Sequence, residues 1–520
     1  MQIDKKARFD AELQHASSSR ADLIPGTSVM DIPELFQLVL SFLSSAADLV
    51  AMACVAKRYS DAALSLIWRT PNFQGDPLLQ MAHLFPDGTC DILVDGKDTS
   101  YRISAEFFLR FDYYANFIRH IHLWKAPPER FIAGILSASR PGVWLFPHLI
   151  SIHIGCDGDT LHAAGPYLTP SLKELKINHW EPENLPVVAS SSRTTAILLQ
   201  IFELPDLEVL DLMDTRYPDY EHNTELVDAL IEMIPQLVSF SACDFTTVKR
   251  VYDALSKSRK LRSLFLDLGQ EREPQLHHEL DTLIKLTRQN FPALQDLSIL
   301  CAGPEASRFL RQVNRELHCV DLRIEGDLVV EGLQELVQSV TNSTSSLRTF
   351  KCGSSEPADD PGERRLIDAL KPLGAMTSLR HLYIAMSFTG TQMLSDADID
   401  TLFAAWPHMQ TFTLESDPGA ERPVLTEDEP MGFALTLTAI QQIQHYAPSL
   451  KELHLSYVDL SHIPDIPKPV FTESFDTVEI LFTRSHAHNR RAIRGFINKL
   501  WRRVTLDFEA CCLMTLPHSD

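Results

Sequence analysis

Side chains that bind metals or act as nucleophiles gather at a few places in this sequence, and none of these groups has the spacing of a known site. Residues 277–279 read His-His-Glu within a stretch of helical spacing, where adjacent histidines point to different faces and do not share one metal ion. His486 and His488 lie two apart, and Cys511 and Cys512 are adjacent. We therefore expect no metal site and no cofactor.

The sequence also lacks the short motifs that mark common catalytic sites. It contains no phosphate-binding loop of the form G-x-x-x-x-G-K-(S/T), no G-x-G-x-x-G, no G-x-S-x-G and no H-E-x-x-H. We therefore expect that the protein is not an enzyme. A hydrolase whose site is assembled from scattered residues is the alternative from that class.

The composition restricts the classes of partner and the cellular compartment that we expect. The chain has 520 residues, 45% of them hydrophobic, which is enough for large buried cores. Its formal net charge of −22 argues against a nucleic-acid partner, because phosphate binding needs clustered positive charge. The nine cysteines form no C-x-x-C pair, and neither a signal peptide nor an apolar run of membrane-spanning length is present. We expect no membrane partner and a cytoplasmic or nuclear location.

One basic stretch, residues 484–503, has the pattern of an amphipathic helix. Its apolar residues between Ile493 and Leu500 fall on one stripe, and arginines occupy the rest of the surface. Such a helix could meet a membrane or an acidic partner. We favour the alternative that it is the outer helix of a last repeat with a solvated basic face, because this also explains the strand-like VTLDF (504–508) that follows.

The elements that position these groups follow from a pattern that recurs through most of the chain. It reads apolar-Pro-x-Leu-x-x-Leu-x-Leu, as in LPDLEVLDL (204–212) and APSLKELHL (447–455). Alternation of apolar and polar residues predicts a short strand with one buried face. The segments between copies, such as 225–234 and 277–290, have helical spacing. Strands separated by helices pair in parallel, so we predict an α/β fold in which a leucine-rich-repeat solenoid has a curved parallel sheet inside and helices outside.

This pattern also divides the chain. We predict a flexible leader at 1–24, a helical domain at 25–70, a transition segment at 71–112, the repeat array at 113–510 and a tail at 511–520. The first apolar position of each copy is Phe117, Leu149, Leu172, Leu207, Leu237, Leu261, Leu294, Leu317, Leu347, Leu379, Met409, Leu450 or Val478.

Two stretches rich in proline, glycine and acidic residues interrupt the array. They are residues 351–365 and 415–432, and their composition predicts mobile surface loops. Such loops are either neutral insertions or contacts to a ligand.

The residues that alternate with the buried positions of each strand form one outward face. Acidic residues outnumber basic ones there, so we hypothesise that this face binds a basic or neutral segment of an unknown target protein, with a merely solvated face as the alternative. The residues that we expect to contact the target are Glu174, Asp211, Phe265, Asp267, Asp296, Asp321, Arg323 and Tyr383.

Residues 31–70 differ from the array, because they read as three short helices. Asp31 can cap a first helix that carries Pro33, and apolar residues then recur at three- and four-residue spacing. Two further helical segments follow, ending at Tyr59 and Trp68. A core of this size is usually stable only with a partner.

The order of these residues resembles the F-box family. It runs Ile-Pro-Glu-Leu, Val-Leu-x-Phe-Leu, Asp-Leu, Val-Ala-Lys-Arg-Tyr and Leu-x-x-Ile-Trp-Arg within about 40 residues. Ile32, Ala56 and Tyr59 depart from the residues most common in that family but keep their apolar or aromatic character. The array behind it resembles the long, helix-bearing repeats that follow F-boxes, including those of fungi.

This resemblance implies a role without catalysis. F-boxes bind the Skp-type adaptor of a cullin-RING ubiquitin ligase, so the chain would be the substrate-recognition subunit of that ligase, and the repeats would hold the target. The alternative is a scaffold of the same build that acts outside a ubiquitin ligase. Leu38 and Phe42 are expected inside the helical core. The adaptor-facing positions implied by the resemblance are Ile32, Pro33, Leu35, Val39, Leu40, Leu43, Val55, Tyr59 and Trp68.

Overall fold

The structure is a computed structural model, and all structural statements concern the residues that it describes. These residues are 33–43, 45–69, 105–123, 140–156, 164–179, 192–212, 223–242, 245–268, 290–313, 316–356, 364–386, 394–415, 435–456, 458–460, 462–464, 478–483, 490–501 and 503–509.

The chain forms two compact units, and each is described by itself. The first comprises residues 1–156 and 163–172, and the second comprises 157–162 and 173–520. The described chain is α/β, as predicted, with a long parallel sheet and outer helices.

The first unit begins with three helices that share a small core. They are α2 (Pro33–Leu40), α3 (Ala46–Val55) and α4 (Lys57–Arg69). The Ser45 side chain caps α3 by accepting a hydrogen bond from the Ala47 N–H at 3.1 Å. This helix ends at Val55 rather than at the predicted Tyr59, which lies on α4. The buried core of the three helices consists of Phe36, Leu40, Leu49, Tyr59 and Ala63.

Helix α7 (Ala105–Ala115) packs beside α4 in the first unit. The rings of Trp68 and Tyr114 lie 5.2 Å apart, and the Tyr113 hydroxyl donates a 2.6 Å hydrogen bond to Asp61. The chain continues into the parallel strands β1 (His120–Leu123) and β2 (Ser151–Cys156), followed by the short helix η3 (Gly165–Tyr167).

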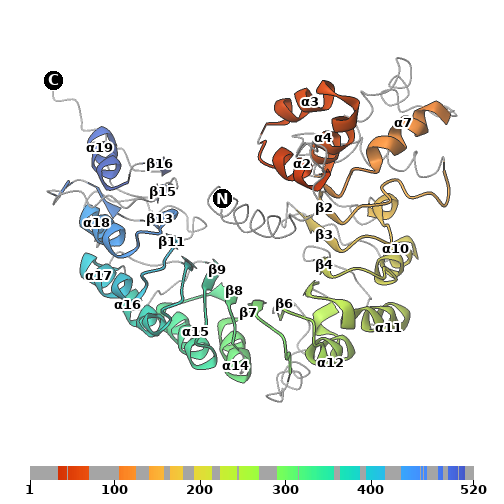
Figure 1. Cartoon of the computed structure of the whole chain (residues 1–520). Helices are drawn as coiled ribbons and strands as arrows, with labels where there is room; N and C mark the ends of the chain where they lie inside the picture. Colours follow the sequence, from red (N-terminus) through yellow and green to blue (C-terminus); the bar gives the residue numbers. More distant parts are fainter. Residues whose placement is uncertain are drawn as a thin grey trace, which may run out of the picture. The chain divides into compact units, whose positions relative to one another are not determined.

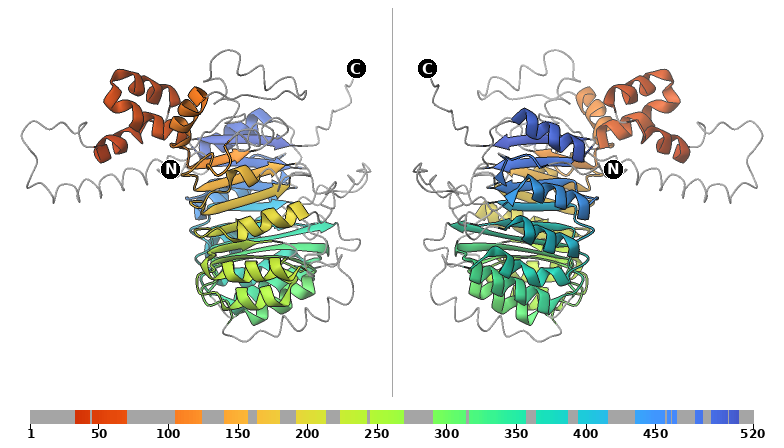
Figure 2. Two further views of the ribbon diagram at one scale, coloured as in Figure 1. Left: turned by 90° about the vertical axis from the view of Figure 1, so that its right-hand side faces the viewer. Right: turned by 90° about the vertical axis from the view of Figure 1, so that its left-hand side faces the viewer.

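The second unit is a parallel ladder of strands covered by helices. Its strands are β3 (Glu174–His179), β4 (Val209–Asp211), β5 (Ser239–Ser241), β6 (Ser263–Asp267), β7 (Asp296–Cys301), β8 (Cys319–Asp327), β9 (Thr349–Glu356), β10 (His381–Ala385), β11 (Thr411–Glu415), β13 (Glu452–Ser456), β15 (Val478–Thr483) and β16 (Val504–Glu509), in this spatial order, with β12 (Leu435–Thr436) and β14 (Val458–Asp459) forming a small second sheet. Figures 1 and 2 show that the strands of this unit lie side by side along an inner surface and that the helices lie outside them.

The helices of the second unit alternate with its strands. The α-helices are α10 (Ser192–Phe202), α11 (Thr224–Met233), α12 (Lys249–Lys257), α14 (Gly303–Gln312), α15 (Val330–Ser343), α16 (Leu366–Leu370), α17 (Asp396–Ala405), α18 (Leu437–Tyr446) and α19 (Arg490–Leu500), and the short 3-10 helices are η6 (Ile234–Gln236), η7 (Phe245–Thr247) and η8 (Lys371–Ala375).

The alternating pattern of the sequence explains this ladder. In the repeat around β9, Leu347, Phe350 and Cys352 are fully buried, whereas Lys351 between them is exposed. Every copy of the pattern lies on or directly before a strand. The buried strand faces and the apolar stripes of the helices form one continuous core, in which Trp406 is fully buried and donates a hydrogen bond from Nε1 to the Leu373 carbonyl at 3.0 Å.

The connections at the two ends of the strands differ. A helix leads into the next strand through a short turn, as between the end of α18 at Tyr446 and the start of β13 at Glu452. The longer connections follow strands, as between the end of β11 at Glu415 and the start of β12 at Leu435.

Some expectations need correction or lie outside the described residues. The predicted loop at 351–365 begins too early, because β9 continues to Glu356 through backbone pairing with β8. The groups at 277–279, 486–488 and 511–512, most of the predicted helix 277–290 and most of the insertion 415–432 lie outside the described residues. Within the described part, no helix is long and apolar enough to cross a membrane.

Candidate functional site

The adaptor-facing positions implied by the resemblance separate into buried and exposed residues. Leu40 is fully buried, and Tyr59 and Trp68 are nearly so. Tyr59 packs on Phe36 with ring centroids 4.6 Å apart, and Trp68 packs on Tyr114. These three residues therefore build the core of the first unit, and the expectation that they face a partner needs correction.

The remaining positions lie at or near the surface. Val39 is 41% exposed and Val55 is 67% exposed, while Leu35 and Leu43 are half-buried. The side chain of Pro33, the first residue of α2, is not among those described, and Ile32 lies outside the described residues.

Two further apolar side chains on these helices are exposed to solvent. Phe42 is 45% exposed, so it does not lie in the core as expected, and Val50 on α3 is 50% exposed. With Val39 and Val55 they form a set that we call the apolar helix surface. Exposed apolar side chains on so small a helical unit are typical of a surface that a partner protein covers.

The outward side chains of the second unit fall into rows, because the strands are in register. Glu174 and Asp296 belong to the first row, at the first residue of each strand. The middle row, two residues further along, consists of Lys176, Asp211, Ser241, Phe265, Ser298, Asp321, Lys351, Tyr383, Thr413, His454, Leu481 and Asp507. The third row includes Asp267, Leu300, Arg323, Gly353, Ala385 and Glu415. The structure therefore brings the expected target-contacting residues onto one face.

Several charges on this face are already balanced. Lys176 Nζ lies 2.6 Å from Glu174 Oε1, and Arg323 Nη2 lies 4.0 Å from Asp321 Oδ2. Phe265 is only 5% exposed, with the Arg323 guanidinium 5.9 Å from its ring centroid, so it offers a partner little surface. The placement of Phe265 as an open contact residue needs correction.

Two hydrogen-bonded groups cross the face between β10 and β13. The Thr411 hydroxyl lies 3.1 Å from His381 Nδ1 and donates to Glu452 Oε2 at 3.3 Å. The Tyr383 hydroxyl donates to Glu415 Oε2 at 3.2 Å, and His454 Nδ1 lies 4.0 Å from the same oxygen. Burial lowers the pKa of His381, so its imidazole is neutral at pH 7. Burial likewise raises the pKa of Asp296.

A further row precedes the strands, and the sequence interpretation overlooked it. The backbone N–H of Arg348 donates to the His318 carbonyl, that of Arg380 to Arg348, that of Gln410 to Arg380 and that of Lys451 to Gln410, all within 2.8 Å. These residues are therefore neighbours across the N-terminal edge of the sheet. The signal in the sequence is the recurrence of a basic residue directly after the first leucine, as in Leu-Arg-Thr and Leu-Arg-His.

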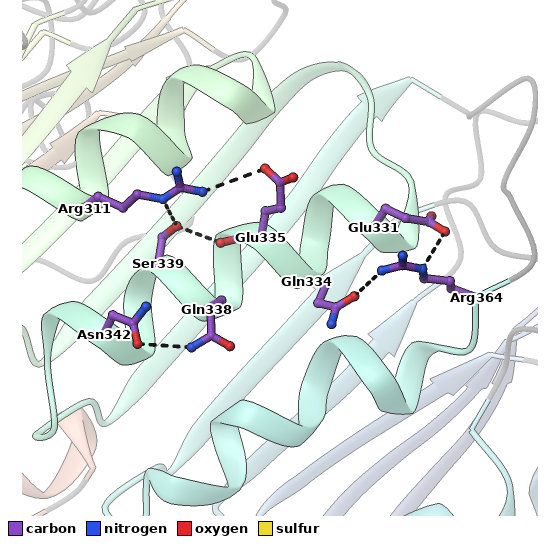
Figure 3. A pocket seen from close by; sticks show the side chains of 8 residues that line it. All are labelled: Arg311, Glu331, Gln334, Glu335, Gln338, Ser339, Asn342 and Arg364. Atoms are coloured by element: carbon purple, nitrogen blue, oxygen red, sulfur yellow. Dashed lines mark hydrogen bonds and ion pairs between the residues drawn. The ribbon is translucent and has the colours of Figure 1, made fainter.

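The outer helices carry an open groove of about 450 Å³, which Figure 3 shows. Side chains of α15 bind both arginines of the groove. Arg311 Nε donates a hydrogen bond to Ser339 Oγ at 3.2 Å. Arg364 donates one to Gln334 Oε1 at 2.7 Å and lies 3.3 Å from Glu331. Because these contacts balance its charges and its lining is polar, we interpret the groove as a joint between neighbouring repeats.

The three thiols of the ladder, Cys301, Cys319 and Cys352, do not have the environment of a nucleophile. Burial raises the pKa of Cys301 and Cys352, and it raises that of Cys319 to about 11. A thiol that stays protonated at pH 7 is a poor nucleophile and a poor metal ligand. Within the described part of the chain, no group of three His, Cys, Asp or Glu side chains is placed to hold a metal ion.

No family model matches the chain, and no significant match was found among curated proteins.

Proposed function

We propose that this chain is the substrate-recognition subunit of a cullin-RING ubiquitin ligase, acting in the cytoplasm or nucleus. Its N-terminal helices would bind the Skp-type adaptor and, through it, the cullin. Its repeat array would bind a target protein. The chain would supply no catalytic residue.

The observation that carries this proposal is the apolar helix surface. Val39, Phe42, Val50 and Val55 are all at least 41% exposed, although the core beneath them is small. Because residues 31–70 resemble the F-box in the order of their motifs, the partner that we infer for this surface is a Skp-type adaptor. Burying such side chains at an interface gives a helix partner its anchor points.

The array supports the second half of the proposal. It offers a long outward face with polar side chains at regular spacing, which suits recognition of another protein. Holding a target close to the ubiquitin carrier raises its effective concentration there, so such a subunit accelerates transfer without any reacting group of its own.

An adaptor pull-down tests the first half. We expect the purified chain to bind a purified Skp-type adaptor, and Val39→Asp and Val55→Asp each to weaken binding about tenfold or more, because a charge replaces a buried apolar contact. Both side chains are exposed in the free chain, so the variants should fold normally. Leu109→Asp is the matched control, since Leu109 is 74% exposed on α7 of the same unit.

Three outcomes decide the proposal. An unchanged affinity of Val55→Asp, or a wild-type chain that does not bind, overturns adaptor docking through these helices. Binding of the adaptor without assembly on a cullin would favour the scaffold alternative. Assembly on a cullin with ubiquitin transfer to a captured protein supports the ligase role.

A further inference from the structure

One part of the sheet face departs from the negative charge of the whole chain. Around β9 and β10 the structure gathers Arg348, Lys351, Arg380 and Lys451, all exposed, together with the half-buried His318 and His381. We call these six residues the cationic patch. The formal net charge of the chain is −22, so a local excess of positive charge has to come from the arrangement of the strands.

The register fixes the distances within the patch. Arg348 and Arg380 directly precede the adjacent strands β9 and β10, so their backbones are about 4.8 Å apart, and Lys451 directly precedes β13, two strands beyond β10. Lys351 lies on β9, three residues and about 10 Å beyond Arg348. Arg348 and Arg380 are the chain neighbours of Thr349 and His381, which are cross-strand partners.

Charges of both signs act on His381. Burial is the main cause that lowers the pKa of this histidine; Glu452 raises it, and Lys351, Arg380 and Lys451 lower it. His381 is therefore close to three cations of the patch and to one carboxylate.

Three cations of the patch, Arg348, Lys351 and Arg380, are exposed and available to a ligand. Among the described residues, no ion pair uses Arg348, Lys351 or Arg380. Three carboxylates lie beside the patch and each has a partner: Asp321, the cross-strand neighbour of Lys351, lies 4.0 Å from Arg323, Glu316 accepts hydrogen bonds from the Ser345 N–H and hydroxyl, and Glu452 accepts one from Thr411. Between β8 and β11, the edge row and the first row contain no carboxylate.

We propose that the cationic patch binds an extended acidic segment of a partner protein, with its Asp or Glu side chains against Arg348, Arg380 and Lys351. An extended chain presents side chains on one side about every 6.8 Å, so two or three carboxylates fit the roughly 14 Å from Arg348 to Lys451. Guanidinium groups suit carboxylates because they donate two parallel hydrogen bonds.

This proposal deepens the target-binding half of the proposed function. It rests on the proposed function where it identifies the bound partner as the target protein. The third row, at the other ends of the strands, carries both signs of charge, because Arg323 lies in the same row as Asp267 and Glu415.

Fluorescence anisotropy with the purified full chain tests the patch. The probe is a labelled peptide with glutamate at alternate positions, and its counterpart has glutamine there. We expect the glutamate peptide to bind and the affinity to fall as salt is raised, because exposed charges are screened. Arg348→Glu and Arg380→Glu should each weaken binding about tenfold, and the double variant should abolish it.

The matched control has the same charge change on another basic surface. Arg491→Glu and Arg494→Glu lie on exposed positions of α19, within the basic stretch singled out in the sequence. We expect these variants to bind the peptide as wild type does. Circular dichroism and the Tm of all variants should match wild type, since the substituted side chains are exposed.

Several results would overturn the proposal. Equal affinity for the glutamate and glutamine peptides, an equal loss in the α19 variants, or binding only of a phosphorylated peptide would each do so. Tighter binding of single-stranded DNA than of the peptide at about 0.15 M salt would point to a nucleic acid instead. The measurement uses no adaptor, so a failed adaptor pull-down leaves it intact, and a failed peptide titration leaves adaptor binding intact.

Discussion

The three helices of the first unit and the strand ladder of the second distribute apolar side chains in opposite ways. The helices enclose a small core and expose Val39, Phe42, Val50 and Val55. The ladder buries its apolar residues on one side of each strand and places mostly polar side chains, such as Lys351 and Tyr383, on the other. The helices therefore suit a partner that covers apolar surface, whereas the sheet suits recognition through charges and hydrogen bonds.

The difference also concerns how each region is stabilised. A core as small as that of the three helices depends strongly on each member. The ladder adds similar contributions repeat by repeat, so each repeat depends mainly on its neighbours. Substitutions in the two regions should therefore differ both in size and in how far their effects spread.

The largest effect is expected from Trp406→Ala in the ladder. This side chain is fully buried, contacts Phe403 in a T-shaped arrangement and donates a hydrogen bond to the Leu373 carbonyl. Its removal leaves a large cavity, so we expect a loss of about 3–5 kcal/mol in the free energy of unfolding. Urea denaturation followed by far-UV circular dichroism measures this loss.

Trp406→Phe is the matched control, because it keeps an aromatic ring and removes the indole N–H. We expect it to cost less than the alanine variant. Hydrogen exchange should locate the loosening in the repeats around η8, α17 and β11, while β4 and β5 remain protected. Equal loosening at β4 would mean that the ladder unfolds as one block.

The next effect is expected from Leu40→Ala in the helices. Leu40 is fully buried against a core of few residues, and its truncation should cost about 2–4 kcal/mol. That loss is comparable to the stability that a small helical unit has by itself, so we expect residues 33–69 to become sensitive to protease while the ladder stays resistant. Limited proteolysis with mass spectrometry measures this.

Exposed Leu109→Asp serves again as control, with no change in the cleavage pattern. A ladder cleaved as readily as the helices in Leu40→Ala would show that the two regions are not independent in stability. Added adaptor should restore protease resistance to the helices of the variant if the proposed docking holds.

The smallest effect concerns a turn of the ladder at Glu316. The Ser346 hydroxyl and the Ser345 backbone N–H lower the pKa of Glu316 below its ordinary value of 4.5. A lowered carboxyl pKa contributes stability above pH 4.5 that is lost as the pH falls through the folded value. Glu316→Gln should therefore lower the Tm slightly at pH 7, by the equivalent of less than about 1 kcal/mol, and the difference should vanish at an acid pH at which the carboxyl is protonated in the folded chain as well.

Scanning calorimetry at both pH values decides this prediction. The side chain is exposed, which limits the effect. A difference that stays constant or grows toward low pH would assign the role of Glu316 to packing rather than to charge.

The strands of the ladder could be predicted from the sequence, because burial of one strand face makes apolar and polar residues alternate. The spacing of Leu347, Phe350 and Cys352 is enough to predict a strand there. The helical periodicity of the segments between strands likewise predicts the helices. The sequence did not separate core from surface in the three helices. Phe36 and Phe42 fall at similar spacing, but only the packing of α2 on α4 decides that Phe36 is buried and Phe42 exposed.

The cationic patch was missed for a different reason. The strand pattern predicts outward residues only between the buried positions of a strand, whereas Arg348 and Arg380 precede their strands and become neighbours through the register of adjacent strands. Residues that are more than thirty positions apart in sequence become neighbours only when that register is known. Phe265 shows the converse, because its outward position is covered by the Arg323 side chain from another strand.

The unequal connections at the two ends of the strands have a consequence for how such a protein can change. Length added after a strand, as between Glu415 and Leu435, leaves the ladder intact, whereas length added in the tight turn before β13 would break the register that aligns Arg380 with Lys451. New specificity can therefore be acquired by insertion at one edge alone. Peptide tags and inserted domains should be placed after β11 rather than before β13.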